Sequence, residues 1–224
     1  SPLFFMFNSE DLRQIAAHGL SVESVEQQIE NFKRGFPFLK VVRAASVGDG
    51  VRALGGEELS RATMRYDAES ATLKVVKFVP ASGAATRMFK ELFEFVNEGR
   101  RGKGIDTLLG NIKKFAFWPE LEHFINDKST DEEIVAAIVK HGLAYGSKPK
   151  GLVTFHAYAD GNRKAVEEHL VEGALYGAAN GVVRLHFTVS PEHEDAFRAL
   201  LAERTAKYEA LFGVKYDISF SEPL

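Results

Sequence analysis

Residues 182–220, VVRLHFTVSPEHEDAFRALLAERTAKYEALFGVKYDISF, contain a strand, a helix and a second strand in immediate succession. Short runs rich in β-branched and aromatic residues predict the two strands over 182–189 and 214–220. Between them, Ser190 is placed to cap a helix, and Gly213 to end it. Strands joined by a helical crossover are expected to pair in parallel, so this stretch predicts an α/β fold.

The same alternation continues toward the N-terminus of the chain. A strand is predicted over 152–158 and a helix over 165–177, and an earlier apolar run predicts a strand over 73–79. Because strands and helices alternate at these lengths, we expect a mostly parallel, doubly wound sheet.

Four segments are predicted. They are an N-terminal helical appendage over 1–38, a first part of the α/β domain over 39–98, a helical insert over 99–146 and a second part of the α/β domain over 147–224. Within the insert, helices are predicted over 107–127 and from a capping box at Thr130 and Glu133 to Lys140. The chain stops just past a predicted strand, so we expect the second part to be truncated and the sequence to be a piece of a longer protein.

Composition excludes several classes of function. The 224 residues are 45% hydrophobic and 26% charged with a net charge of −3, whereas a general nucleic-acid-binding protein would carry a basic face. No apolar run reaches the length of a membrane span, so neither a nucleic acid nor a membrane is predicted as a partner. The absence of cysteine excludes disulfides and a cysteine zinc site, and it fits a reducing, cytoplasmic location.

The stretch KFVPASGAATRMFKE, residues 77–91, places a loop of small residues between a predicted strand and a predicted helix. Ligands of open parallel sheets bind beyond the carboxyl ends of the strands, where a loop without bulky side chains lets backbone N–H groups approach a phosphate. The predicted phosphate-binding residues are Ser82, Gly83, Ala84, Ala85 and Thr86, and Arg87 adds a guanidinium suited to phosphate. The alternative interpretation is a tight turn required only for packing.

Three motifs resemble those of the sugar-nucleotide pyrophosphorylases, which join a sugar 1-phosphate to a nucleoside triphosphate. GAATRM at 83–88 resembles their G-x-G-T-R signature, KPKGLVTFHAYADGNRKAVEEHLVEGALY at 148–176 resembles their P-K-G-L segment, and 185–222 resembles a later strand, helix and strand. The motifs occur in the family's order and cover about half of the chain. The whole chain also resembles the N-terminal part of an uncharacterised bacterial family with a domain of unknown function.

The resemblance to the pyrophosphorylases implies a nucleotidyltransferase fold and chemistry. A sugar-phosphate oxygen would attack the α-phosphorus of a nucleoside triphosphate, with Arg87 on the leaving pyrophosphate, Lys150 on the α-phosphate or sugar phosphate, and Mg²⁺ bridging phosphates. Ala85 departs from the family's second glycine, and Glu222 stands where the family has glutamine. The resemblance implies no particular base, sugar or oligomeric state.

Two other interpretations remain open, a non-catalytic nucleotide or nucleotide-sugar binding module and a structural half-domain of a longer protein. Histidine is also a common metal ligand. Glu168, His169 and Glu172 lie on one predicted helix, for which a solvated helix face is the expected interpretation.

Overall fold

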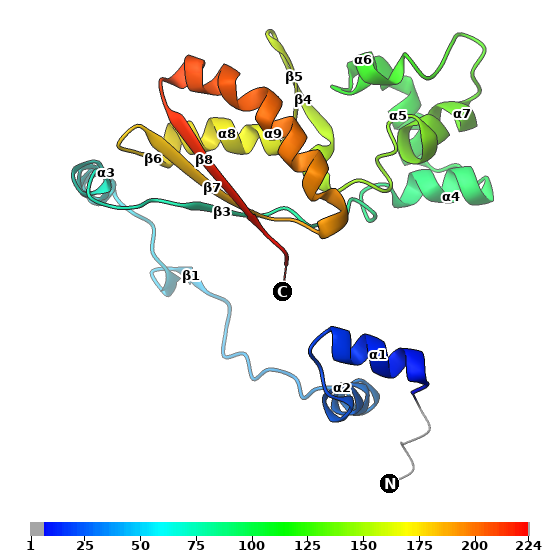
Figure 1. Ribbon diagram of the computed structural model, residues 1–224, viewed down its shortest axis with the longest axis horizontal. Coiled ribbons are helices and arrows are strands. Elements are labelled where there is room, and N and C mark those ends of the chain that lie inside the picture. The colour runs from blue at the N-terminus through cyan, green and yellow to red at the C-terminus, as the bar shows by residue number, and fades with distance from the viewer. Residues whose placement is uncertain (1–6, 224) are drawn as a thin grey trace. The chain divides into compact units, whose positions relative to one another are not determined.

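The computed structural model describes residues 7–223, which divide into two compact units, the first ending at Glu57 and the second beginning at Glu58 (Figure 1). The first unit contains two helices, α1 (Ser9–Ala17) and α2 (Val22–Arg34), and a minimal sheet of β1 (Ser46–Val47) and β2 (Gly50–Val51). Helices α1 and α2 were predicted as part of the appendage over 1–38, of which residues 1–6 lie outside the described residues.

The second unit is built on a sheet of four strands. These are β3 (Lys77–Pro80), β6 (Ala178–Ala179), β7 (Val182–Thr188) and β8 (Lys215–Ser221). Strands β3 and β8 pair with β7 in parallel, and the short β6 pairs with it in antiparallel. Helix α9 (Pro191–Phe212) connects β7 to β8, so the predicted strand–helix–strand unit of 182–220 is confirmed.

Two helices cover one face of this sheet. Helix α8 (Ala165–Tyr176) and α9 pack together, and in Figure 1 both lie above β7. Alternate residues of β7 point into the core between them, and Val183, Leu185 and Phe187 are almost fully buried. The opposite face carries the intervening residues, such as His186, which is less buried and stacks on the exposed ring of Phe78. The fold is therefore mixed α/β, and the small, mixed sheet does not confirm a doubly wound parallel sheet.

The predicted strand at 152–158 forms, but it does not join the main sheet. Strand β4 (Thr154–Tyr158) pairs in antiparallel with β5 (Gly161–Lys164), and two residues connect them. The prediction of a third parallel strand here was wrong because a local partner two residues away costs less loop entropy than a distant one. The hairpin precedes α8 and positions the first turn of that helix.

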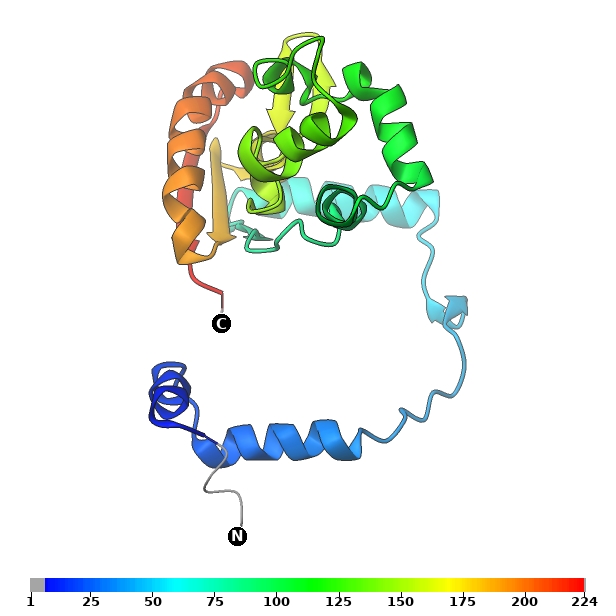
Figure 2. The same cartoon turned by 90° about the vertical axis from the view of Figure 1, so that its right-hand side faces the viewer.

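A cluster of short helices fills the segment between β3 and the hairpin and lies to the right of the sheet in Figure 1. The green and yellow-green ribbons of the same segment and hairpin gather together in Figure 2. Its elements are α4 (Lys90–Glu98), α5 (Lys103–Gly110), the 3₁₀ turn η2 (Ile112–Lys114), α6 (Trp118–Leu121), α7 (Asp131–Ala136), the π-helical turn η3 (Ala137–His141) and the 3₁₀ turn η4 (Lys150–Leu152).

The single helix predicted over 107–127 was wrong, whereas the capping box at Thr130 was right. Pro119 lies in the first turn of α6, where its missing N–H costs nothing, but a helix passing through it would lose a hydrogen bond and clash with the preceding turn. The Thr130 hydroxyl accepts the N–H of Glu133, and the Glu133 carboxylate accepts the N–H of Thr130. Helix α3 (Gly56–Ser70) precedes β3.

Candidate phosphate-binding site

Two segments far apart in the sequence meet beyond the carboxyl end of β3. The N–H of Lys150 donates to the carbonyl of Gly83 at 3.1 Å, and Ala84 and Pro149 form an antiparallel bridge beside it. The N–H of Ala81 donates to the carbonyl of Thr188 at 2.8 Å, which holds the start of the loop at the end of β7. The sequence-predicted loop and the sequence-predicted lysine are therefore brought together.

A cavity of about 280 Å³ lies at this junction. Its wall is formed by the end of β3 and the following loop, the turn η4, the first turns of α8 and one side chain of α9. The lining residues are Val79, Pro80, Ala81, Gly83, Lys150, Gly151, Ala165, Val166, His169 and Phe197. The cavity thus combines an open stretch of backbone with a lysine at the place where ligands of open α/β sheets bind.

The two lining glycines differ in what surrounds them. A Cβ built on Gly83 would have no atom within 4 Å, whereas one on Gly151 would lie 2.7 Å from Cε1 and Cζ of the Phe197 ring. Phe197 is fully buried in the core between the sheet and its helices. Gly151 is therefore required for packing, and Gly83 leaves its space open toward the cavity.

The charged groups at the cavity are Lys150 and, behind it, an ion-pair cluster. Among the described residues, the exposed Lys150 ammonium has no hydrogen-bond or ion-pair partner. His169 lies 3.3 Å from Glu172, whose carboxylate is bound by Lys77 from β3. Burial lowers the pKa of His169, and the neighbouring Lys77 lowers it further, so the ring is neutral near pH 7. Lys150 is thus the cationic side chain available to an anion.

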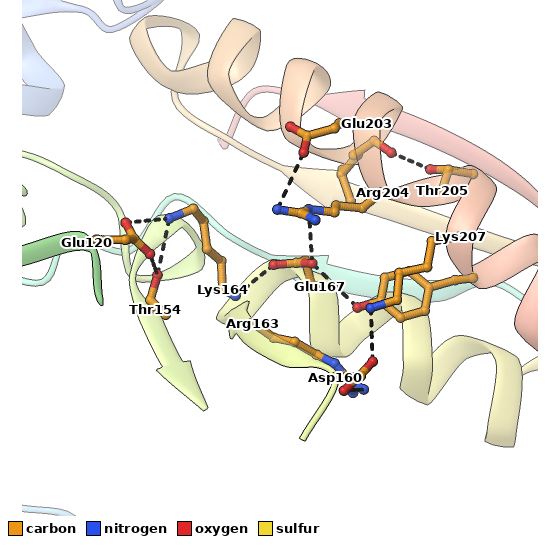
Figure 3. Close-up of polar contacts among 12 residues, drawn as sticks. Glu120, Thr154, Asp160, Arg163, Lys164, Glu167, Glu203, Arg204, Thr205 and Lys207 are labelled. Carbon is orange, nitrogen blue, oxygen red and sulfur yellow. Dashed lines mark hydrogen bonds and ion pairs between the residues drawn. The ribbon is translucent and has the colours of Figure 1, made fainter. Parts of the chain in front are cut away.

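The first turn of α8 already holds a carboxylate of its own. Glu167 is 3% exposed and accepts the N–H of Lys164 at 2.8 Å. Figure 3 shows its side chain directed toward α9, where it lies 3.4 Å from the guanidinium of Arg204 and 3.4 Å from the hydroxyl of Tyr208. Because an acidic side chain at the helix start partly neutralises the helix dipole, an anion in the cavity would depend mainly on Lys150 and the loop backbone.

The remaining predicted site residues do not line the cavity. Ser82 is half-buried, Ala84 and Thr86 are exposed, and Arg87 is exposed on the turn before α4. Among the described residues Arg87 has no hydrogen-bond or ion-pair partner. Ala85 is fully buried among the aromatic residues of the helical cluster, so its methyl group is a packing contact. The structure therefore brings together Gly83 and Lys150 but places Arg87 outside the lining.

Sequence reasoning missed one polar residue of this cavity. His169 was expected on a solvated helix face, but it is half-buried and contacts the cavity. Lys77 is the signal in the sequence that could have located His169. It is a charged residue in an otherwise apolar strand, and it therefore requires an acidic partner on the helix that packs against that strand. Glu172, one helical turn after His169, is that partner.

The side chains present do not form a Mg²⁺ site at this cavity. No carboxylate lines it, and no group of three His, Asp or Glu residues within 7–223 could hold a metal ion. Mg²⁺ prefers carboxylate and phosphate oxygens, so a lysine and a neutral histidine do not fit it.

The geometry defines a mixed α/β protein with a candidate anion site at the carboxyl end of its sheet. The chain belongs to the family described as a domain of unknown function, DUF4301, which matches residues 8–223. No curated protein and no solved structure matches the chain. Over residues 7–223, no helix has the length and apolar character needed to cross a membrane.

Proposed function

We propose that the cavity between Gly83 and Lys150 binds a phosphate ester, and that the protein is nucleotidyltransferase-like. In the reaction proposed, an oxygen of a sugar 1-phosphate attacks the α-phosphorus of a nucleoside triphosphate. The bond from the α-phosphorus to the bridging oxygen breaks, and pyrophosphate leaves with that oxygen. The observation that carries the proposal is the hydrogen bond from Lys150 to Gly83, which joins the two motifs of the resemblance at one cavity.

The surroundings of the cavity support an anionic ligand. Lys150 is exposed and unpaired among the described residues, so binding a phosphate would not require an existing ion pair to break. The loop around Gly83 leaves its backbone open, and backbone N–H groups of this kind bind phosphate oxygens. In this proposal the loop backbone at Gly83 holds the triphosphate, and Lys150 stabilises charge on the α-phosphate or sugar phosphate.

The position of Arg87 favours a second candidate function, a non-catalytic nucleotide or nucleotide-sugar binding module. Catalysis of the proposed transfer needs a positive group on the leaving pyrophosphate, and Arg87 does not line the cavity. The burial of Ala85 also fixes the loop next to Arg87 through core packing. Pyrophosphate exchange distinguishes the two functions, because a binding module would bind nucleotide without exchanging labelled pyrophosphate into it.

A thermal-shift panel tests ligand binding at this site. The ligands are UTP, ATP, GTP, CTP and TTP, each with and without Mg²⁺, together with UDP-sugars. We expect at least one to raise the melting temperature, because a ligand that binds only the folded state adds about 2.7 kcal/mol of stability at a hundredfold excess over Kd.

Lys150→Ala is the test variant and Lys128→Ala its matched control. Both lysines are exposed, and neither ammonium has a hydrogen-bond or ion-pair partner in the described part of the chain, but Lys128 lies in a loop of the helical cluster. The proposal predicts a shift that Lys150→Ala removes and Lys128→Ala retains. Equal shifts in wild type and in both variants would refute binding at this cavity, and no shift with any ligand would refute nucleotide binding by this chain.

A further inference from the structure

A second cavity, of about 230 Å³, lies inside the helical cluster and is almost entirely apolar. It is lined from the turn before α4, from α5 and η3, from the segment 115–117 and from β4. The lining residues are Met88, Phe89, Leu92, Leu108, Phe115, Ala116, Phe117, Ile138, Tyr145, Val153, Thr154 and Phe155. Met88, Phe115 and Phe155 are partly exposed and form its rim, whereas Phe117, Ile138 and Tyr145 are buried.

Aromatic rings set the shape of this cavity. Phe115 and Phe117 are stacked with centroids 5.1 Å apart, and Phe117 meets Tyr145 edge to face at 5.9 Å. Phe89 also stacks on Tyr145, with ring centroids 6.0 Å apart. A planar ring is the guest that such walls accommodate best, because aromatic pairs gain energy beyond that of burial alone. The volume also exceeds the ~150 Å³ of an engineered apolar cavity known to bind benzene.

Two of the lining residues, Thr154 and Tyr145, carry hydroxyl groups. The Thr154 hydroxyl donates to Glu120 at 2.6 Å and accepts from Lys164 at 3.2 Å, as Figure 3 shows. Tyr145, 1% exposed, accepts the N–H of Thr154 at 3.3 Å, and the described side chain beside its own O–H is the Thr154 hydroxyl, whose oxygen already accepts from Lys164. Burial raises the pKa of Tyr145, so this hydroxyl keeps its proton at neutral pH.

We propose that this cavity is a binding site for an uncharged ligand with an aromatic ring and one hydrogen-bond acceptor, which would receive the Tyr145 hydroxyl. No charged side chain lines the cavity, so an ionised ligand would lose its hydration without compensation. The Thr154 oxygen already accepts from Lys164, so a ligand acceptor would give the buried Tyr145 O–H an acceptor that it need not share. The proposal does not depend on nucleotide binding at the other cavity.

Acetophenone is the probe, because it carries one aromatic ring and one carbonyl acceptor. Isopropenylbenzene, in which a CH₂ group replaces the carbonyl oxygen, is its isostere without an acceptor. Cyclohexyl methyl ketone keeps the acceptor and removes the aromatic ring. Uridine tests whether the aromatic ring of the natural ligand belongs to a nucleobase or to a free aromatic molecule. Kd values are measured by isothermal titration calorimetry on the full chain.

Wild type is expected to bind acetophenone about fivefold more tightly than isopropenylbenzene and at least about threefold more tightly than cyclohexyl methyl ketone. Tyr145→Phe is expected to abolish the preference over isopropenylbenzene while retaining binding. The matched control is Tyr216→Phe, which removes a hydroxyl that donates to Leu170 at 2.7 Å, away from this cavity, and should keep the preference. Tighter binding of uridine, with the same dependence on Tyr145, would support the proposal with a nucleobase as the natural ligand.

Ala116→Phe provides a second test that does not involve the hydroxyl. Ala116 lines the cavity and is buried, so a phenyl ring there is expected to fill it and abolish binding of every probe. The proposal is overturned if wild type binds none of the probes at millimolar concentration. It is also overturned if Tyr145→Phe keeps the preference for acetophenone over isopropenylbenzene. Unchanged binding by folded Ala116→Phe would equally overturn it.

Discussion

Gly83 and Gly151 line the same cavity but should respond oppositely to a single added methyl group. At Gly83 a Cβ meets nothing within 4 Å, and its φ lies outside the left-handed region. Alanine at such a position restricts the unfolded chain, so Gly83→Ala should leave stability unchanged or raise it by up to about 1 kcal/mol. At Gly151 the Cβ would lie 2.7 Å from two atoms of the buried Phe197 ring, so overpacking should cost about 1–3 kcal/mol.

Urea denaturation followed by circular dichroism measures both free energies of unfolding, and titration with UTP measures the function of the loop. If the ligand approaches the backbone at Gly83, the methyl group should weaken UTP binding about tenfold, or 1.4 kcal/mol, while the fold is retained. If Gly83→Ala lost more than 1 kcal/mol of stability, the inference that the space beside Gly83 is open would be wrong. Unchanged stability of Gly151→Ala would refute its packing role, and unchanged UTP affinity of Gly83→Ala would refute the approach of ligand to this loop.

Further predictions concern the framework around the site. Glu167→Gln should cost about 2 kcal/mol in urea denaturation, because it weakens a buried ion pair and a helix cap, whereas Glu203→Gln at an exposed pair should stay within about 0.5 kcal/mol. Leu170→Ala in the core should cost about 2–5 kcal/mol, whereas Leu175→Ala, 56% exposed on the same helix, should stay within about 0.5 kcal/mol. His169→Gln should reduce the loss of stability that wild type shows as pH falls below about 6.5.

The sign of the His169 prediction follows from its lowered pKa. The unfolded chain takes up a proton near the ordinary histidine pKa, whereas the folded state resists protonation because the ring is buried and close to Lys77. Stability from this residue is therefore present above about pH 6.5 and is lost on acidification through the folded pKa. An identical pH dependence for wild type and His169→Gln would contradict this origin. Equal costs within either matched pair, Glu167 with Glu203 or Leu170 with Leu175, would contradict the burial described for that pair.

The fold was predictable where local signals agree. In 182–220 the residue pattern, the helix cap at Ser190–Pro191 and Gly213 with φ of 66° all indicate the same unit, and the structure confirms it. Pro119 and the turn before Gly161 are also local signals, but the longer helical and strand patterns around them predict continuous elements. The sequence could not predict which helix covers which face of the sheet, because periodicity identifies the apolar face of an element but not the element that buries it.

The candidate site was predictable only in part. The small residues after β3 indicated Gly83, and the resemblance to the pyrophosphorylases indicated Lys150; the structure joins the two by a backbone hydrogen bond. The burial of Ala85 could not be predicted, because it depends on aromatic residues contributed by the distant helical cluster. The same cluster encloses the second cavity, whose buried Tyr145 hydroxyl becomes apparent only when its surroundings in space are known.

An NMR titration of ¹⁵N-labelled protein with UTP tests the central claim most directly, because it locates the ligand on the chain. If the cavity between Gly83 and Lys150 is the phosphate site, the largest saturable shifts should occur in the backbone amides of residues 81–86 and 150–151. The same amides should respond to inorganic pyrophosphate. Saturable shifts confined to other parts of the chain, or no saturable shift with either UTP or pyrophosphate at millimolar concentration, would contradict the account.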